Sequence, residues 1–192
     1  MGESEFPGQC LNLRNQLVAI ELSAVSHHPS IVGSAPAPTR LCLEWPDEAA
    51  TQAFAQQLAA RPELAQAFIA LHGDLGAGKT TLVRHLLQAL GVQGRIKSPT
   101  YAVVESYELP AMAIWHFDFY RFNDPREWED AGFRDIFASP GLKLAEWPDK
   151  AAGLLPRADL ELHLLTRSDN TRQATLSAHS ATGVALLQGL AA

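Results

Sequence analysis

Apolar residues recur along this chain at spacings that change from those of strands to those of helices and back. Residues 67–71 form a short apolar run typical of a buried strand, and residues 79–90 repeat apolar side chains at helical spacing until Gly91 ends the pattern. Residues 160–164 and 174–178 alternate apolar and polar positions instead. This alternation predicts two half-buried strands late in the chain.

Shorter patterns complete the series of elements. Further strands are predicted at residues 41–43, 101–107, 113–119 and 142–145. A helix with acidic residues in its first turn is predicted at residues 47–60. Another helix is predicted to begin at Asp124, with Pro125 at its first position and Glu127 closing a capping box. Strands that alternate with helices are typical of an α/β domain.

Residues 1–39 have a different composition from the rest of the chain. They contain His27-His28-Pro29-Ser30 and a stretch of Gly, Ser, Ala and Pro at 33–38, both typical of turns and linkers. We therefore predict that residues 1–39 form a disordered extension and that one folded domain occupies residues 40–192. No Cys, Asp or third His lies at ligand spacing from the histidine pair, so we predict that it is solvated and holds no metal.

Charge and composition narrow the classes of partner. The net charge of −6 disfavours a broad basic face, so we expect that the protein does not bind DNA and does not bind RNA directly. The apolar runs are too short to cross a membrane. Glu3 and Glu5 stand where a secretory signal would carry basic residues, and two cysteines are too few for a disulfide framework. These features predict a cytoplasmic protein.

The clearest motif is a phosphate-binding loop between the predicted strand at 67–71 and the predicted helix at 79–90. Gly73-Asp74-Leu75-Gly76-Ala77-Gly78-Lys79-Thr80 matches the complete G-x-x-x-x-G-K-[ST] pattern. Its glycines let several backbone N–H groups converge on a polyphosphate at a helix N-terminus. We predict that Lys79 reaches the β- and γ-phosphates, that the Thr80 hydroxyl is a magnesium ligand and that Thr81 adds a contact to the α-phosphate.

A phosphate-loop protein also needs a carboxylate at the end of a neighbouring strand. Asp118 and Glu146 each follow an apolar run that predicts such a strand. Ser98-Pro99-Thr100 suits a switch segment whose hydroxyl completes a magnesium shell, or is a plain turn. Trp147 either stacks on a purine ring or belongs to the core. The residues alone leave these alternatives open.

Four motifs together resemble one family. They are Gly73–Thr81, Ser98–Tyr101, His116–Arg121 and Glu146–Pro148, and their order and separations are similar to those of the TsaE family, also called YjeE. The resemblance covers the chain from about residue 41 to its end. It implies a small bacterial ATPase, with ATP and Mg²⁺ as cofactors, required for the threonylcarbamoyl modification (t6A) of the adenosine beside the anticodon in tRNAs that read ANN codons. Its implied partners are TsaB and TsaD, with TsaD performing the group transfer and tRNA met only through the complex.

The resemblance also implies roles for single residues. Glu146 takes the place of the Walker-B carboxylate and magnesium ligand, and Asp118 that of a catalytic carboxylate near the γ-phosphate. Trp147 is placed beside the nucleotide, whereas Asp47 and Arg172 flank the base. The implied catalytic set is Asp118, Glu146, Lys79 and Thr100, with Ser98 as a second switch residue. The implied nucleotide-binding set is Asp74, Leu75, Gly76, Ala77, Gly78, Lys79, Thr80, Thr81, Trp147, Asp47 and Arg172, and the implied metal ligands are Thr80 and Glu146.

Two features of the sequence depart from the family pattern. Residues 1–39 precede the usual family start, and Asp149 and Lys150 lie where the family varies and receive no role. A GTPase is disfavoured because no lysine follows an asparagine, as an Asn-Lys-x-Asp segment requires. A small-molecule kinase is disfavoured because the sequence has no paired-Arg segment that could form the lid of such an enzyme. A nucleotide-gated binding module that does not hydrolyse ATP remains an alternative function. We predict a three-layer P-loop NTPase-type α/β domain, with a central, largely parallel sheet and late antiparallel strands.

Overall fold

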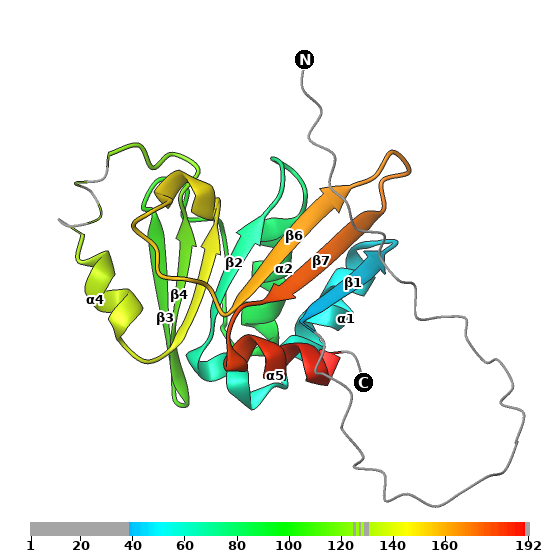
Figure 1. Ribbon diagram of the computed structural model, residues 1–192, viewed down its shortest axis with the longest axis horizontal. Helices are drawn as coiled ribbons and strands as arrows, with labels where there is room; N and C mark the ends of the chain where they lie inside the picture. The colour runs from blue at the N-terminus through cyan, green and yellow to red at the C-terminus, as the bar shows by residue number, and fades with distance from the viewer. Residues whose placement is uncertain (1–38, 125, 127, 129–130, 191–192) are drawn as a thin grey trace, which may run out of the picture. The chain divides into compact units, whose positions relative to one another are not determined.

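A computed structural model describes residues 39–124, 126, 128 and 131–190 (Figure 1). Its strands are β1 (Arg40–Trp45), β2 (Phe68–His72), β3 (Val104–Leu109), β4 (Met112–Asp118), β5 (Leu142–Glu146), β6 (Leu160–Thr166) and β7 (Arg172–Ala178). Its α-helices are α1 (Glu48–Ala59), α2 (Lys79–Ala89), α4 (Phe133–Ala138) and α5 (Ala181–Leu190). Two 3-10 helices, η1 (Pro62–Gln66) and η2 (Pro148–Ala151), complete the elements.

The strands form one mixed sheet in the order β1-β7-β6-β2-β5-β4-β3. The four central strands β6, β2, β5 and β4 are parallel, and their arrows point the same way in Figure 1. The late strand β7 is antiparallel to β6, β1 is antiparallel to β7, and β3 is antiparallel to β4. The predicted fold, an α/β domain with a parallel centre and late antiparallel strands, is confirmed, and β1 and β3 add antiparallel edges that the prediction did not include.

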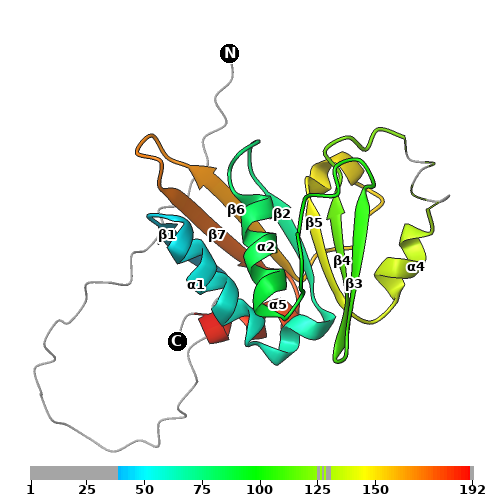
Figure 2. The same cartoon turned by 180° about the vertical axis from the view of Figure 1, so that it is seen from behind.

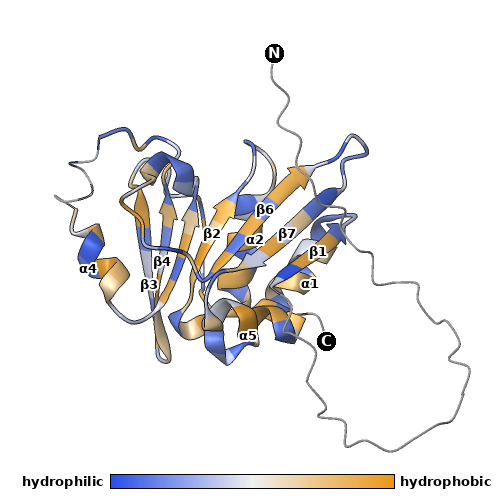
Figure 3. Cartoon of the chain, viewed as in Figure 1, coloured by the Kyte–Doolittle hydropathy of each residue, from blue (hydrophilic) through white to orange (hydrophobic). Residues whose placement is uncertain are grey.

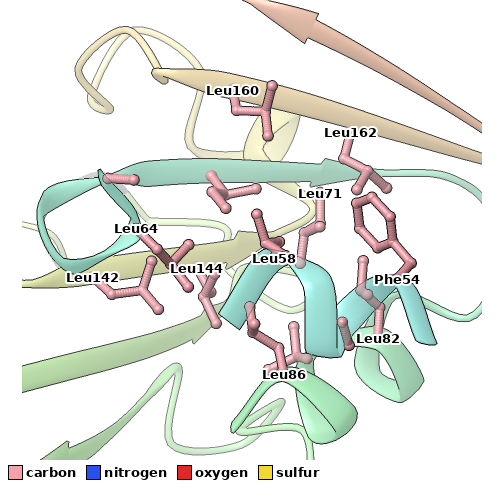
Figure 4. Close-up of a cluster of buried hydrophobic side chains, with 14 of the residues drawn as sticks. Phe54, Leu58, Leu64, Leu71, Leu82, Leu86, Leu142, Leu144, Leu160 and Leu162 are labelled. Atoms are coloured by element: carbon pink, nitrogen blue, oxygen red, sulfur yellow. The ribbon is translucent and has the colours of Figure 1, made fainter. Parts of the chain in front are cut away.

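The core explains why the central strands are so apolar. Figure 2 shows α1 and α2 on one face of the sheet, and the side chains between these helices and the strands form the main hydrophobic cluster (Figure 4). A second, aromatic cluster around Phe117, Phe119 and Phe133 packs on the opposite face. β2 is buried on both faces except at His72, and its ribbon is hydrophobic almost throughout in Figure 3. Burying such a strand on both sides is the usual arrangement in parallel sheets.

The structure moves the start of one predicted strand and adds a C-terminal helix. Residues 101–103 lie outside the strand expected at 101–107, because Val103 has a φ of 65° and its N–H bonds to the Pro99 carbonyl in a turn. The C-terminal helix α5 was not predicted, since its sequence is apolar almost throughout and shows no helical period. Gly183 is required in α5, because a Cβ there would lie 1.9 Å from the Asp159 carbonyl oxygen.

Some predictions fall on residues that the structure does not describe. A helix was predicted to begin at Asp124, and the Oδ1 atom of Asp124 accepts a hydrogen bond from the Arg126 N–H. The other two residues of that prediction, Pro125 and Glu127, lie outside the described residues. Residues 1–38 also lie outside them, so the predicted extension stays a prediction. Among the described residues, no helix is both long enough and apolar enough to span a membrane.

Candidate nucleotide-binding site

The predicted site residues gather at the carboxyl ends of β2, β4 and β5. The phosphate-binding loop follows β2 and leads into α2 at Lys79. Asp118 is the last residue of β4 and Glu146 the last of β5, and the two are register partners across the parallel pair. Ligands of open α/β sheets bind at this edge, because the strands end there and the helices begin there. Sequence-distant carboxylates therefore meet at the loop.

Glycine is needed at Gly73 because the backbone of β6 passes close to it, and at Gly78 because its φ is one that other residues rarely adopt. Gly73 has a φ of 135°, and a Cβ at this position would lie 2.4 Å from the carbonyl oxygen of Leu164 on β6. Gly78, at the N-cap of α2, has a φ of 108°, and the Nε atom of Arg172 lies 3.6 Å from the position its Cβ would take. The loop is thus held against β6 at its start and covered by an arginine at its end.

Lys79 is folded back onto the loop. Its side chain is buried, and its ammonium donates to the carbonyl oxygens of Gly73 at 2.5 Å and Asp74 at 2.9 Å. The same Nζ atom lies 3.9 Å from the centroid of the Trp147 ring. Burial lowers the pKa of Lys79, and the nearby charges of Glu146, Asp118 and Asp74 oppose that shift. A phosphate would replace two neutral acceptors with charged ones, which is the stronger bond for an ammonium.

Thr80 and Glu146 form an oxygen-rich pair. The Thr80 hydroxyl lies 2.9 Å from each carboxylate oxygen of Glu146, which is 2% exposed. In the described part of the chain no lysine or arginine forms an ion pair with this buried carboxylate. A hydroxyl beside a buried carboxylate is the kind of donor set that Mg²⁺ prefers, so these two residues fit a magnesium ion.

His116 is a site residue to which the sequence analysis assigned no role. It lies two residues before Asp118 on β4, and its fully buried ring places Nε2 2.9 Å from Oε1 of Glu146. Its Nδ1 atom is buried without a hydrogen-bond partner. Residues two apart on a strand share a face, so the spacing to Asp118 was the signal that could have drawn attention to His116. The contact holds the Glu146 carboxylate in place toward Thr80.

Asp118 links the strand edge to the predicted switch segment. Its Oδ2 accepts bonds from the hydroxyls of Ser98 and Thr100, the latter at 2.6 Å, and its Oδ1 accepts one from the Tyr120 N–H at 2.9 Å. The hydroxyl oxygens of Ser98 and Thr100 are 2.7 Å apart. The structure therefore brings both predicted switch residues to Asp118, for which the resemblance implies a catalytic role. All four side chains, Tyr120 included, line a cavity of about 270 Å³ together with Lys79, Thr80, Glu146 and Trp147.

A second cavity lies on the other side of the loop. It has a volume of about 140 Å³, shares Gly76, Gly78 and Thr81 with the first, and is closed by Trp45, Glu48, Thr51, Leu164 and Arg172. Arg172 therefore lies beside the loop, and its contact with the base stays a prediction. Asp47 does not line this cavity: it is the N-cap of α1, and its Oδ1 accepts a bond from the Ala50 N–H at 2.8 Å. Its neighbour Glu48 lines the cavity instead.

Trp147 lines the larger cavity with Lys79 and Thr80, and we call this the phosphate-side cavity because the predicted phosphate-binding residues line it. Trp147 has a φ of 58°, and its ring centroid lies 5.0 Å from that of Tyr120. Trp147 does not line the second cavity, which Arg172 lines. The structure places Trp147 against Lys79, and its predicted contact with the base is not tested.

Trp147 is expected to report nucleotide binding. Drawing Lys79 toward a phosphate removes a cation from the face of the indole, so ATP or ADP should change tryptophan fluorescence, and Trp147→Phe should remove most of that change. Trp115→Phe, a partly buried tryptophan on β4 away from the cavity, is the matched control and should leave the response intact. A full response in Trp147→Phe would contradict the assignment.

Comparison with known proteins supports the family resemblance of the motifs. A family model described as threonylcarbamoyl adenosine biosynthesis protein TsaE matches residues 45–174. The chain belongs to the TsaE family. The tRNA threonylcarbamoyladenosine biosynthesis protein TsaE of Haemophilus influenzae is 51% identical over 94 residues, which are 49% of this chain and 60% of that protein. The protein of the same name from Bacillus subtilis is 34% identical over 110 residues, which are 57% of this chain and 68% of the relative.

A solved structure extends the similarity to the fold. The crystal structure of YdiB from Bacillus subtilis superposes with a TM-score of 0.64 at 25% sequence identity, covering 79% of this chain and 94% of the other. The matched segment of the TsaE model runs from the end of β1 to the middle of β7. It therefore contains the loop, the switch segment and both strand-end carboxylates.

Proposed function

We propose that this protein is a cytoplasmic, magnesium-dependent ATPase. In this proposal it supports the threonylcarbamoyl modification (t6A) of the adenosine beside the anticodon in tRNAs that read ANN codons, acting with TsaB and TsaD. Membership in the TsaE family supports the biosynthetic role. The observation that carries the ATPase assignment is the convergence of Lys79, Thr80, Asp118 and Glu146 on one cavity at the carboxyl edge of the sheet.

The proposed reaction uses these residues in separate roles. Water attacks the γ-phosphorus of ATP, the bond from that phosphorus to the β–γ bridging oxygen breaks, and ADP and phosphate are released. Lys79 exchanges its two carbonyl partners for the β- and γ-phosphates. Asp118 orients the attacking water, and its present bonds to Ser98 and Thr100 couple this role to the switch segment.

Thr80 and Glu146 would hold the magnesium ion in this proposal. The ion, when bound, supplies positive charge that neutralises the developing charge on the phosphate oxygens. For the protein, the requirement is that the hydroxyl and the carboxylate separate from each other enough to share the ion. His116 keeps the Glu146 carboxylate oriented during that change, because their 2.9 Å contact does not involve Thr80.

The lining of the phosphate-side cavity supports a need for partners. None of the described arginines lines it, and Arg121, which directly follows Tyr120, lies 4.5 Å from the ring of Tyr101 instead. A transition state for phosphoryl transfer gains strongly from such a cation. Two exposed large apolar side chains, Leu75 and Tyr120, line the same cavity, as expected where another protein docks. We therefore infer slow hydrolysis by the protein alone.

The test measures ATP hydrolysis by the protein alone and with TsaB and TsaD. We expect the rate to rise by about tenfold or more when both are present, because the partners complete or reshape the cavity. Threonylcarbamoyl transfer to tRNA is followed in the same reactions with TsaB and TsaD held constant. Sustained multiple-turnover modification without this protein would contradict the proposed function, as would a hydrolysis rate that TsaB and TsaD leave unchanged.

A further inference from the structure

A cluster of two histidines and a glutamate lies on the sheet face opposite to α1 and α2. On β2 and β6, Leu71 and Leu162 point into the core beneath these helices. Because side chains alternate along a strand, His72, Glu161 and His163 point to the other face. His72 and His163 are register partners across the parallel pair of β2 and β6. The cluster is therefore positioned by the rigid centre of the sheet.

The three side chains are close enough to share one ion. The His72 and His163 rings are stacked, with centroids 4.2 Å apart and planes within 6° of each other. One ligand atom from each of the three residues lies within 4.8 Å of the others. A tetrahedral zinc ion with bonds of about 2.1 Å separates its ligands by about 3.4 Å. Binding thus requires an inward movement of roughly 1 Å, which rotation of the half-exposed His163 ring supplies.

His72 is already arranged as a ligand. Its Nδ1 atom lies 3.3 Å from Oδ2 of Asp149, and a proton on Nδ1 serves that contact. This tautomer leaves a lone pair on Nε2, which is buried and has no hydrogen-bond partner. Histidines that bind metals commonly give their second nitrogen to a carboxylate in this way. The unpartnered buried nitrogen is the observation that distinguishes this cluster from a surface ion pair.

Glu161 is positioned by a third histidine, His179. Nε2 of His179 lies 3.0 Å from Oε2 of Glu161, and Arg157 contacts the other nitrogen of His179 at 3.2 Å. These contacts fix the position of the Glu161 side chain beside the two stacked rings.

We propose that His72, His163 and Glu161 bind one divalent transition-metal ion of the zinc type. Two imidazoles and a carboxylate suit Zn²⁺ or Ni²⁺ and discriminate against Mg²⁺, which takes oxygen ligands. The site is distinct from the proposed magnesium position at Thr80 and Glu146. It joins β2 to β6 directly before Gly73, so an ion here fastens the strand that ends at the phosphate-binding loop.

The test is calorimetric titration of the untagged full chain with Zn²⁺ in excess Mg²⁺, without nucleotide. We expect one ion per chain, and an affinity about tenfold or more weaker in His72→Gln, His163→Gln and Glu161→Gln. The double variant with His27→Gln and His28→Gln is the matched control. It removes two histidines that are neighbours in the sequence but not part of the proposed site, so the affinity for Zn²⁺ should be unchanged. Co²⁺ provides a second readout: its visible absorption band should appear in wild type and be lost in His163→Gln.

The proposal is overturned in either of two ways. Zn²⁺ binding that persists in both His72→Gln and His163→Gln, or that disappears in the His27/His28 control, assigns the ion to another part of the chain. Circular dichroism and thermal melting verify the fold of each variant. If His72→Gln, at a mostly buried position, fails to fold, His163→Gln decides the question, because its side chain is 51% exposed.

Discussion

Replacing Lys79 with alanine is expected to abolish tight ATP binding. The ammonium sits at the centre of the loop, where it now donates to two backbone carbonyls, and it is the only lysine lining the phosphate-side cavity in the described structure. A hydrogen bond to a charged group is worth about 1.5–3 kcal/mol. Losing two such bonds corresponds to an affinity at least about a hundredfold lower. Equilibrium binding of ATP, measured by calorimetry, gives this value directly.

Two variants make the Lys79 result specific. Lys150→Ala removes a lysine at an exposed position after Trp147 and should leave ATP affinity unchanged. Thr80→Ala should retain much of the affinity in the absence of magnesium but lose the gain that magnesium provides, because its hydroxyl is the proposed ligand. Wild-type ATP affinity in Lys79→Ala would contradict the assignment of the loop as the ATP-binding site. Unchanged magnesium dependence in Thr80→Ala would contradict the assignment of Thr80 as a magnesium ligand.

Glu146→Gln and Asp118→Asn are expected to leave assembly with TsaB and TsaD intact and to stop sustained tRNA modification. Both carboxylates are buried, so the change does not alter the outer surface that a partner meets. The amide of Glu146→Gln still reaches Thr80 and His116 but carries no charge for the metal. Removing one such group from an active site typically slows turnover by about a hundredfold or more. Complex formation is measured by co-elution and turnover by threonylcarbamoyl transfer under multiple-turnover conditions.

Glu108→Gln is the matched control for these two variants. It removes one carboxylate from an exposed position on β3 and should sustain modification at the wild-type rate. Multiple-turnover modification at full rate in Glu146→Gln or Asp118→Asn would refute the catalytic roles. Failure of either variant to join the complex would place the carboxylate in partner binding instead, contrary to its burial.

The parts of the site that are local in the chain could be predicted from the sequence. The loop motif, the strand before it and the helix after it are contiguous, so glycine positions and helical spacing were enough to locate Lys79 and Thr80. Asp118 and Glu146 were found for a similar reason: each ends an apolar run, and the carboxyl ends of parallel strands meet at one edge. The confirmed α/β fold follows from the same periodicities.

Residue pairs that are distant in the chain needed the tertiary structure. His116 and Glu146 are 30 positions apart, and only the register of β4 on β5 places the imidazole on the carboxylate. Asp47 is another case: the bond that its Oδ1 accepts from the Ala50 N–H makes it the cap of α1, and its contact with the base stays a prediction. Competing uses of one side chain cannot be separated until its neighbours are known.

The sequence by itself determined which chemistry this chain carries, because phosphate binding depends on backbone freedom and side chains within one short segment. The tertiary structure decided what surrounds that segment. It laid Arg172 over Gly78, folded Lys79 onto Trp147 and stacked His72 on His163. The residues in these three contacts are 94, 68 and 91 positions apart in the chain, and only strand order and register bring them together. The sequence alone could not select this arrangement, since several strand orders satisfy the same alternation of apolar and polar residues.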